Sequence, residues 1–292
     1  MIEIASERLR AAINPLGAEL SSLRDEAGRE LMTDADPAYW SGRAPLLFPI
    51  VGKLNGDRYR YDGRDYAMPQ HGFARRRTFE LVTQAEDRAA FRLTDDAETR
   101  AAYPFAFALD VDFAIHGAAL SIGVRATNRG EAEMPASFGF HPAFAWPLPY
   151  GAARGDHRIV FAEDEPEGLR YLSQGGIAPD RRPSPLDGKV LALDDGLFAN
   201  DALIWDRLAS RSVRYGAPGT PQLEIDFPEM PMLGIWTKPG AQFVCIEPWH
   251  GLADPAGFDG DLREKPGIAL VAPGQSLYCT MRIALLAASC DA

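Results

Sequence analysis

Cysteine is scarce in this sequence. Three cysteines occur among 292 residues, at Cys245, Cys279 and Cys290, and no two of them form a CxxC pair. An odd number of widely spaced cysteines supplies neither a disulfide framework nor a zinc cluster. Cys245 and Cys279 lie within apolar runs typical of strands, so we expect both to be small buried side chains.

Long apolar runs and an excess of positive charge are also missing. No uninterrupted apolar run approaches the ~18 residues of a membrane span. Residues 1–7 carry acids where a signal peptide would carry a basic region. The net charge is -11, from 41 acidic and 30 basic residues, and such a field repels polyphosphates. We therefore expect a cytoplasmic protein that binds neither nucleic acid nor membranes, although a local basic pocket for a small anion remains compatible with this charge.

Common cofactor motifs are absent as well. The chain has no GxxxxGK[ST], no glycine pattern that opens a dinucleotide-binding helix, no HExxH and no GxSxG. The acidic stretch 254–261 misses the one-three-five spacing of a calcium loop. We therefore expect no cofactor and no metal.

Alternation with a period of two dominates what the sequence does contain, and it predicts strands. Large apolar residues occupy every odd position from Phe107 to Ile115, and the pattern resumes from Leu120 to Ala126 after a His116-Gly117 turn. Helical periodicity is rare, and the best candidate is 95–103, with Thr94 or Asp95 as its cap. Further strand candidates are 9–13, 19–24, 78–83, 90–94, 223–227, 233–237, 243–247 and 277–285. Many short strands separated by turns predict one large all-β sandwich or barrel domain over residues 1–292.

Two segments in the first third of the chain hold candidate binding residues. The apolar run 45–54 ends with Lys53 before an Asn-Gly turn, and a buried strand with a snorkelling lysine explains it equally well. The segment 69–77 combines His71 with three successive arginines that begin at Arg75. A charge run is usually a solvated surface, but a structured loop that offers His and Arg can recognise hydroxyls or anions.

Two later segments hold candidate acid–base residues. His141 lies among aromatic residues in 137–146, and apolar surroundings lower the pKa of a histidine. Glu247 ends an apolar run beside Pro248 and Trp249, where desolvation raises the pKa of a carboxyl group. Taken separately, each residue also has a structural explanation: His141 as a hydrogen-bonded core histidine, and Glu247 as a buried glutamate held by an arginine.

Taken together, these segments resemble the aldose 1-epimerase family, in particular its LacX-like branch. The residues that carry the resemblance occur in the family's order and are Leu47–Leu54, His71–Arg75, Gly139–Pro142 and Ile246–Trp249. The resemblance implies a galactose mutarotase-like fold, which is a large antiparallel β-supersandwich with few short helices and a site in a cleft on one sheet.

The resemblance also implies roles for individual residues. Glu247 matches the family's general base, His141 its general acid, and His71 a histidine that binds the sugar. An aspartate that binds sugar hydroxyls falls within 198–205 and is assigned to Asp201. Lys53 matches a family arginine only approximately, because a lysine cannot reproduce a bidentate arginine contact.

Arg75 and Trp249 complete the expected substrate-binding set. Arg75 can bind hydroxyls or an anion, and Trp249, like Phe73 and Phe140, can cover the apolar face of a pyranose. Strand parity permits these aromatic side chains to point into the cleft or away from it.

The implied activity is that of an isomerase of carbohydrate metabolism, which interconverts the α and β anomers of a hexose by opening and reclosing its ring. Glu247 must be ionised and His141 protonated for this, and we expect the charges of Glu247 and Asp201 to sustain the imidazolium. Two alternatives remain: a hexose-6-phosphate mutarotase that uses Lys53 and 75–77 to bind phosphate, and a carbohydrate-binding protein without turnover. The expected partner is a neutral or phosphorylated sugar, and exposed strand edges allow a homodimer.

Overall fold

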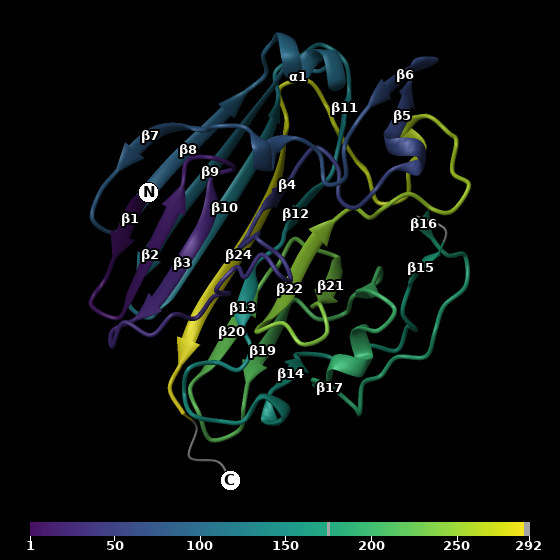
Figure 1. The fold of residues 1–292 in the computed structure, drawn as a ribbon. Helices are drawn as coiled ribbons and strands as arrows, with labels where there is room; N and C mark the ends of the chain where they lie inside the picture. The colour runs from purple at the N-terminus through teal and green to yellow at the C-terminus, as the bar shows by residue number, and fades with distance from the viewer. Residues whose placement is uncertain (174–175, 289–292) are drawn as a thin grey trace.

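The computed structural model of the chain describes residues 1–173 and 176–288. Nearly all of its regular structure is antiparallel β-sheet, with one short α-helix and several 3₁₀ turns in this part of the chain (Figure 1). The predicted all-β antiparallel class with few short helices is therefore confirmed. Cys245 and Cys279 are buried, as expected, and Cys290 lies outside the described residues.

The largest sheet has nine strands, and alternating apolar residues form its inner face. Phe113, Ile122 and Met281 lie side by side in register on neighbouring strands, and all three are buried. In spatial order the strands are β17 (Val190–Ala192), β14 (Arg158–Phe161), β19 (Ser212–Gly216), β20 (Gln222–Asp226), β24 (Ser276–Leu286), β10 (Ala119–Asn128), β9 (Phe107–His116), β8 (Arg88–Thr94) and β7 (Glu80–Gln84).

A six-stranded sheet packs against the large one and carries the candidate site. Its order is β18 (Leu203–Trp205), β21 (Met232–Trp236), β22 (Phe243–His250), β12 (Phe138–Phe140) and β4 (Leu46–Leu47), with β13 (Ala143–Ala145) also paired to β22. The apolar run 45–54, for which a buried strand was one explanation, forms only the two-residue β4. Strand β22 is buried at every residue except His250. Strands covered on both faces read as continuous apolar runs, which explains the sequence before Glu247.

Aromatic side chains fill the space between the two sheets. Phe144 on β13 contacts Tyr215 on β19, and Trp205 on β18 contacts Phe161 on β14. Each of these pairs joins the six-stranded sheet to the nine-stranded one. One side of the six-stranded sheet is therefore packed against the nine-stranded sheet, while its other side faces the candidate site.

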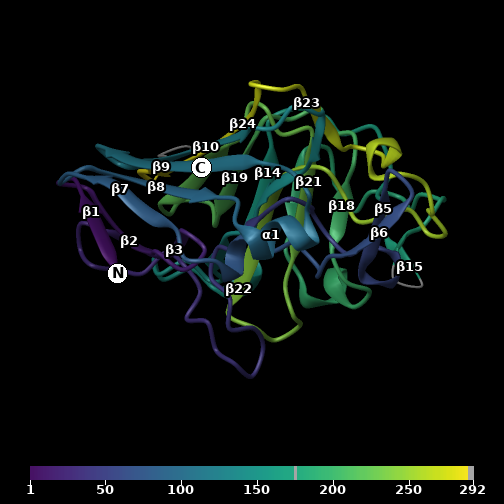
Figure 2. The same cartoon turned by 90° about the horizontal axis from the view of Figure 1, so that it is seen from above.

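Smaller elements lie around the two sheets. A three-stranded sheet lies at one end of the molecule, and the β5–β6 hairpin and β15 lie at the other (Figure 2). These elements are β1 (Ile2–Ala5), β2 (Leu9–Asn14), β3 (Glu19–Asp25), β5 (Arg58–Tyr61), β6 (Arg64–Ala67), β11 (Met134–Ala136), β23 (Ala269–Val271), β15 (Leu172–Ser173), β16 (Gly176–Ile177), η1 (Asn55–Asp57), η2 (Ala74–Arg76), η3 (Arg154–Asp156), η4 (Asp195–Phe198) and η5 (Leu262–Glu264).

The predicted helix forms, but it is shorter than expected and has a different cap. Helix α1 spans Ala97–Ala102, and its N-cap is Asp96, whose side chain accepts a hydrogen bond from the Thr99 backbone N–H at 2.7 Å. Asp95 accepts instead from the backbone N–H of Phe107 and from Arg100. None of the helices among the described residues has the length and apolar character needed to cross a bilayer.

Candidate active site

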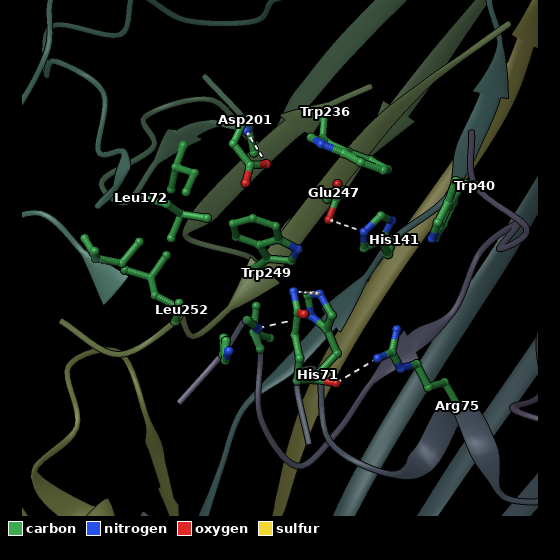
Figure 3. A pocket seen from close by; sticks show the side chains of 18 residues that line it. Trp40, His71, Arg75, His141, Leu172, Asp201, Trp236, Glu247, Trp249 and Leu252 are labelled. Carbon is green, nitrogen blue, oxygen red and sulfur yellow. Dashed lines mark hydrogen bonds and ion pairs between the residues drawn. The ribbon is translucent and has the colours of Figure 1, made fainter. Parts of the chain in front are cut away.

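A cavity of about 420 Å³ opens on the outer side of the six-stranded sheet (Figure 3). Its floor comes from β21 and β22, and its walls come from β18, from η2, from the separate β15–β16 pair and from loops around the sheet. The residues that line it are Trp40, Val51, Gly52, Lys53, Gln70, His71, Arg75, His141, Leu172, Ile177, Asp201, Ala202, Ile204, Trp236, Glu247, Trp249, Leu252 and Ala253. All seven residues predicted from the sequence as catalytic or substrate-binding are among them.

Glu247 and His141 meet at the floor of the cavity. Glu247 lies on β22, and His141 directly follows β12, which pairs with β22. The distance from Glu247 Oε2 to His141 Nε2 is 3.2 Å, and the side chains are 2% and 10% exposed. The buried Glu247 is therefore paired with this histidine. The non-catalytic explanation, in which an arginine holds the glutamate, does not apply.

Burial shifts the pKa values of the two groups in opposite directions. It raises the pKa of Glu247 well above its usual range, and the nearby charge of Asp201 raises it further. Burial also lowers the pKa of His141 to about 3. Both directions agree with the sequence prediction, and both favour a neutral carboxyl group beside a neutral imidazole. Burial therefore opposes the ion pair that the expected catalytic roles require.

The ion pair and the neutral pair nevertheless contain the same number of protons. A neutral carboxyl group beside a neutral imidazole differs from a carboxylate beside an imidazolium only in the position of one proton. Across 3.2 Å that proton can move directly between Oε2 and Nε2. The arrangement can therefore supply a base and an acid without exchange of protons with solvent.

Aromatic rings enclose the imidazole of His141. The indole of Trp40 stacks on it with ring centroids 4.9 Å apart and an interplanar angle of 29°. Trp236 and His71 meet it edge-on, at 6.0 Å and 5.7 Å. These contacts leave the ring little freedom to turn away from Glu247.

Trp249 lies across the sheet because its two neighbouring strands carry glycines. A Cβ on Gly139 of β12 would lie 2.7 Å from Trp249 Cδ1, and a Cβ on Gly234 of β21 would lie 2.3 Å from Cη2. Only glycine at both positions leaves room for the indole, whose other side lines the cavity. Trp249 therefore points into the cleft, which strand parity alone left open.

His71 lies in a loop that crosses the segment after β4, and this segment holds its ring in place. The backbone N–H of Gly52 donates to His71 Nδ1 at 3.1 Å, so the ring proton of the neutral form lies on Nε2, beside the Gln70 side chain. The next residue, Gly72, has φ of 71°, and a Cβ there would lie 2.1 Å from the Phe48 carbonyl oxygen. Two of the motifs noted in the sequence therefore fold against each other.

Only one arginine of the run 75–77 lines the cavity. Arg75 donates from Nη2 to the Gln70 carbonyl at 2.8 Å, and its buried Nε has no partner. Arg77 instead pairs with Asp96 and Glu98 at the start of α1. Of the expected phosphate-binding set, Lys53 and residues 75–77, only Lys53 and Arg75 line the cavity.

Lys53 and Asp201 lie at the more open part of the cavity. Lys53 is about half exposed, and its Nζ lies 3.7 Å from Asp57 Oδ1. Asp201 is exposed, has φ of 78°, and accepts the N–H of Ala202 through Oδ1 at 2.8 Å. Its second carboxylate oxygen remains available for a ligand hydroxyl (Figure 3).

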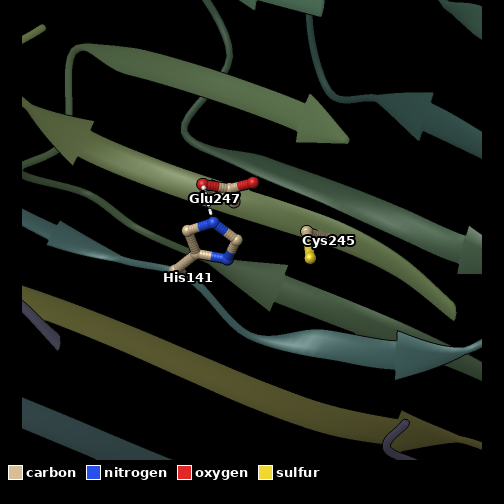
Figure 4. A group of neighbouring side chains, drawn as sticks. All are labelled: His141, Cys245 and Glu247. Atoms are coloured by element: carbon tan, nitrogen blue, oxygen red, sulfur yellow. Dashed lines mark ion pairs between the residues drawn. The ribbon is translucent and has the colours of Figure 1, made fainter. Parts of the chain in front are cut away.

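Cys245 adds a third donor next to the acid–base pair (Figure 4). Donor atoms of His141, Cys245 and Glu247 lie within 4.8 Å of one another, which makes this trio a potential metal site among the described residues. A thiol must lose its proton to bind a metal, and burial raises the pKa of Cys245 well above its usual range. Cys245 also does not line the cavity. We therefore regard Cys245 as a buried neighbour of the pair and derive no step through a metal.

Sequence reasoning missed Trp40, Trp236 and Gln70, which also line the cavity. No motif connects Trp40 to the site, because it lies in a loop that precedes β4. Three of the five tryptophans of the chain, Trp40, Trp236 and Trp249, line this cavity, and only the structure brings them together.

The chain resembles known proteins in both its sequence and its fold. A family model described as aldose 1-epimerase matches residues 1–260. The chromosomally encoded protein LacX of Lactococcus lactis subsp. lactis is 35% identical over 283 residues, which cover 93% of this chain and 95% of that protein.

Two solved structures share the fold over nearly their whole length. The galactose mutarotase related enzyme from Lactobacillus acidophilus has a TM-score of 0.89 and 31% identity, covering 99% of this chain and 98% of that one. A galactose mutarotase-like protein from Lactobacillus casei ATCC 334 has a TM-score of 0.88 and 30% identity, covering 98% of this chain and 100% of that one.

Proposed function

Because the chain belongs to the aldose 1-epimerase family, as its motifs predicted, we propose that it interconverts the α and β anomers of a hexose. The observation that carries the proposal is the Glu247–His141 pair, 3.2 Å apart at the floor of a cavity large enough for a sugar ring. The proposed enzyme is an isomerase that needs only its own side chains for proton transfer.

Sugar binding begins the proposed cycle by moving the shared proton from Glu247 to His141. An anomeric hydroxyl that donates a hydrogen bond to Glu247 favours the carboxylate form. The carboxylate then removes the hydroxyl proton, and the imidazolium protonates the ring oxygen as the bond between C1 and that oxygen breaks. The electron pair of the O–H bond forms the C1 carbonyl, and the electron pair of the breaking bond stays on the ring oxygen.

The open-chain sugar then faces a neutral carboxyl group and a neutral imidazole. This is the proton arrangement that burial favours, so the intermediate does not leave an unpaired charge in the site. Rotation about the C1–C2 bond presents the other face of the carbonyl. The same steps in reverse close the ring as the other anomer, and each proton transfer contributes ~10²–10⁴-fold to the rate.

The remaining lining residues hold the sugar in this scheme. Trp249 covers an apolar face of the pyranose, and His71 donates from Nε2 to a hydroxyl. Asp201 accepts from hydroxyls at the open side, where its position near Glu247 is supported by its effect on the pKa of that residue. Lys53 and Arg75 donate to further oxygens of the ligand.

The test is anomer exchange measured by saturation-transfer NMR with glucose, galactose and further neutral, acidic and phosphorylated aldoses. Exchange faster than the buffer rate for at least one aldose supports the proposal. Binding of sugars without any faster exchange would instead indicate a carbohydrate-binding protein without turnover.

A hexose 6-phosphate is the second candidate substrate class, and Arg75 favours it. Its guanidinium lines the cavity and keeps a buried Nε without a partner, and a phosphate oxygen is a strong acceptor for such a donor. Comparison of glucose with glucose 6-phosphate at equal concentration separates the two classes.

A further inference from the structure

The segment 34–42 forms a loop whose two ends are fixed to the strand that follows His141. Thr33 donates its N–H to the Ala143 carbonyl at 3.0 Å, and Ala143 donates its N–H to the Arg43 carbonyl at 2.8 Å. The Arg43 guanidinium closes the loop with hydrogen bonds to the carbonyls of Thr33 and Asp34, at 2.7 Å and 3.2 Å. The loop and His141 are therefore anchored to one short strand, β13.

Trp40 is the residue of this loop that reaches the site. Its indole stacks on His141, meets Trp236 edge-on at 5.7 Å and contacts Phe243 at 5.7 Å. It also lines the cavity, on the side of His141 that faces away from Trp249 (Figure 3). One face of the imidazole is thus covered by a ring that brings no charge and no titratable group.

We propose that Trp40 is a positioning residue that seals His141 from water and holds its imidazole against Glu247, so that the pair retains one proton under mildly acidic conditions. The proposal rests on the proposed function, because it assigns a task to Trp40 within that acid–base pair. A second proton on the pair would leave Glu247 and His141 both protonated, and no base would remain to accept the proton of the anomeric hydroxyl.

The charged and titratable groups around His141 do not duplicate this role. Glu247 and Cys245 face it from β22, His71 faces it from the loop before η2, and Arg75 acts on it from η2 itself. Arg75 opposes a second proton by its charge, but burial is the larger cause of the low pKa of His141. The Trp40 indole supplies part of this burial. Its removal therefore weakens the main cause of the low pKa of His141.

The decisive experiment follows the imidazole nitrogens of His141 by long-range ¹H–¹⁵N NMR as a function of pH. The proteins compared are the wild type, Trp40→Phe, Trp40→Leu and Trp40→Ala. We expect Trp40→Phe to titrate like the wild type, because it keeps a stacked ring. We expect Trp40→Ala to titrate at least about one pH unit higher, because water reaches the ring. Trp40→Leu keeps apolar volume and should fall between them, which preserves the test if Trp40→Ala does not fold.

The matched control is Tyr39→Ala, which alters the neighbouring half-buried aromatic of the same loop but no residue that lines the cavity. An unchanged His141 titration in Trp40→Ala and Trp40→Leu, or an equal shift in Tyr39→Ala, would overturn the proposal.

A kinetic measurement then connects the titration to turnover. In Trp40→Ala, the acid limb of the kcat/KM profile should move to higher pH by the same amount as the His141 titration, which is at least about one pH unit above the wild type. If no protein in the series accelerates anomer exchange, the proposed function fails, but the NMR titration still decides whether Trp40 controls the protonation of His141.

Discussion

Glu247 Oε2 lies 3.2 Å from His141 Nε2 because strands β22 and β12 pair with Trp249 opposite Gly139. A slip of one residue in this register would turn Glu247 to the other face of the sheet. The two glycines that flank Trp249 oppose such a slip, since only this register gives the indole its space. The geometry of the acid–base pair therefore depends on the packing of a neighbouring aromatic side chain.

Replacement of Glu247 by Gln should reduce turnover strongly and retain sugar binding. A glutamine matches the carboxyl group in shape but cannot exchange a proton with His141, so we expect a loss of ~10²–10⁴-fold in kcat. Anomer exchange by NMR gives the rate, and circular dichroism checks the fold. Glu229→Gln, at an exposed position, serves as the control. Wild-type exchange rates in the Glu247 variant would remove this residue from the mechanism.

The pH profile of the wild type should be broad on its acid side. The pair becomes inactive when it gains a second proton, and burial holds the pKa of His141 at about 3. The pair also becomes inactive when it loses its only proton, which requires a pH above the raised pKa of Glu247. We therefore expect kcat/KM to fall only at strongly acidic pH and again above the raised pKa of Glu247. A half-maximal rate near pH 6.5 in the wild type would contradict the low pKa of His141.

Replacement of Gly234 by Ala should weaken sugar binding more than it affects proton transfer. The added methyl would lie 2.3 Å from Trp249 Cη2, so the indole must tilt away from the sheet. Overpacking of this kind costs ~1–3 kcal/mol, and we expect a raised KM together with a lower Tm. Gly123→Ala on β10 is the matched control, since nothing lies within 4 Å of its new Cβ. Equal effects of both variants on KM would show that Trp249 does not contact the sugar.

Replacement of Lys265 by Met should destabilise the protein strongly. Lys265 Nζ lies 2.9 Å from Asp254 Oδ1, and both side chains are almost completely buried beside the loop that contributes Leu252 and Ala253 to the cavity. Loss of one partner leaves an uncompensated buried charge, which costs ~3–5 kcal/mol of unfolding free energy. Lys189→Met removes an exposed pair with Glu163 and should cost at most ~1 kcal/mol. Urea unfolding of both variants provides the comparison.

Replacement of Arg75 by Met should distinguish the two substrate classes. If a phosphorylated hexose is the substrate, loss of the guanidinium should raise KM for glucose 6-phosphate by at least roughly tenfold, corresponding to one charged hydrogen bond of ~1.5–3 kcal/mol. The KM for glucose should change less. Arg76→Met, an exposed neighbour that does not line the cavity, is the control. The same relative change for both sugars would argue against phosphate recognition by Arg75.

Most strands could be predicted from the sequence because alternation of period two is a local property. The pair β9 and β10 follows the predicted ranges closely. Strand β22 continues to His250, beyond the predicted end at Glu247. Proline usually marks a strand end because it lacks an N–H, but Pro248 remains in the ladder opposite Leu233.

The site was predictable where a motif carries its residues and unpredictable where only tertiary contacts do. Glu247, His141 and His71 belong to recognisable segments. Trp40 does not, because its contact with His141 depends on a loop anchored to β13 from a distant part of the chain. The ion pairs of Arg77 could not be predicted from the sequence either, because its partners Asp96 and Glu98 lie about twenty residues away, at the start of α1.

The position of β24 in the large sheet also constrains how the protein is made. This strand, Ser276–Leu286, follows the other described strands in sequence but lies between β20 and β10, in the interior of the nine-stranded sheet. During synthesis, β10 and β20 therefore emerge from the ribosome long before the strand that joins them, with their backbone edges unpaired. Such long-range pairing is slow and leaves nascent chains open to association. Fragments that stop before residue 276 should accordingly need chaperones to remain dispersed.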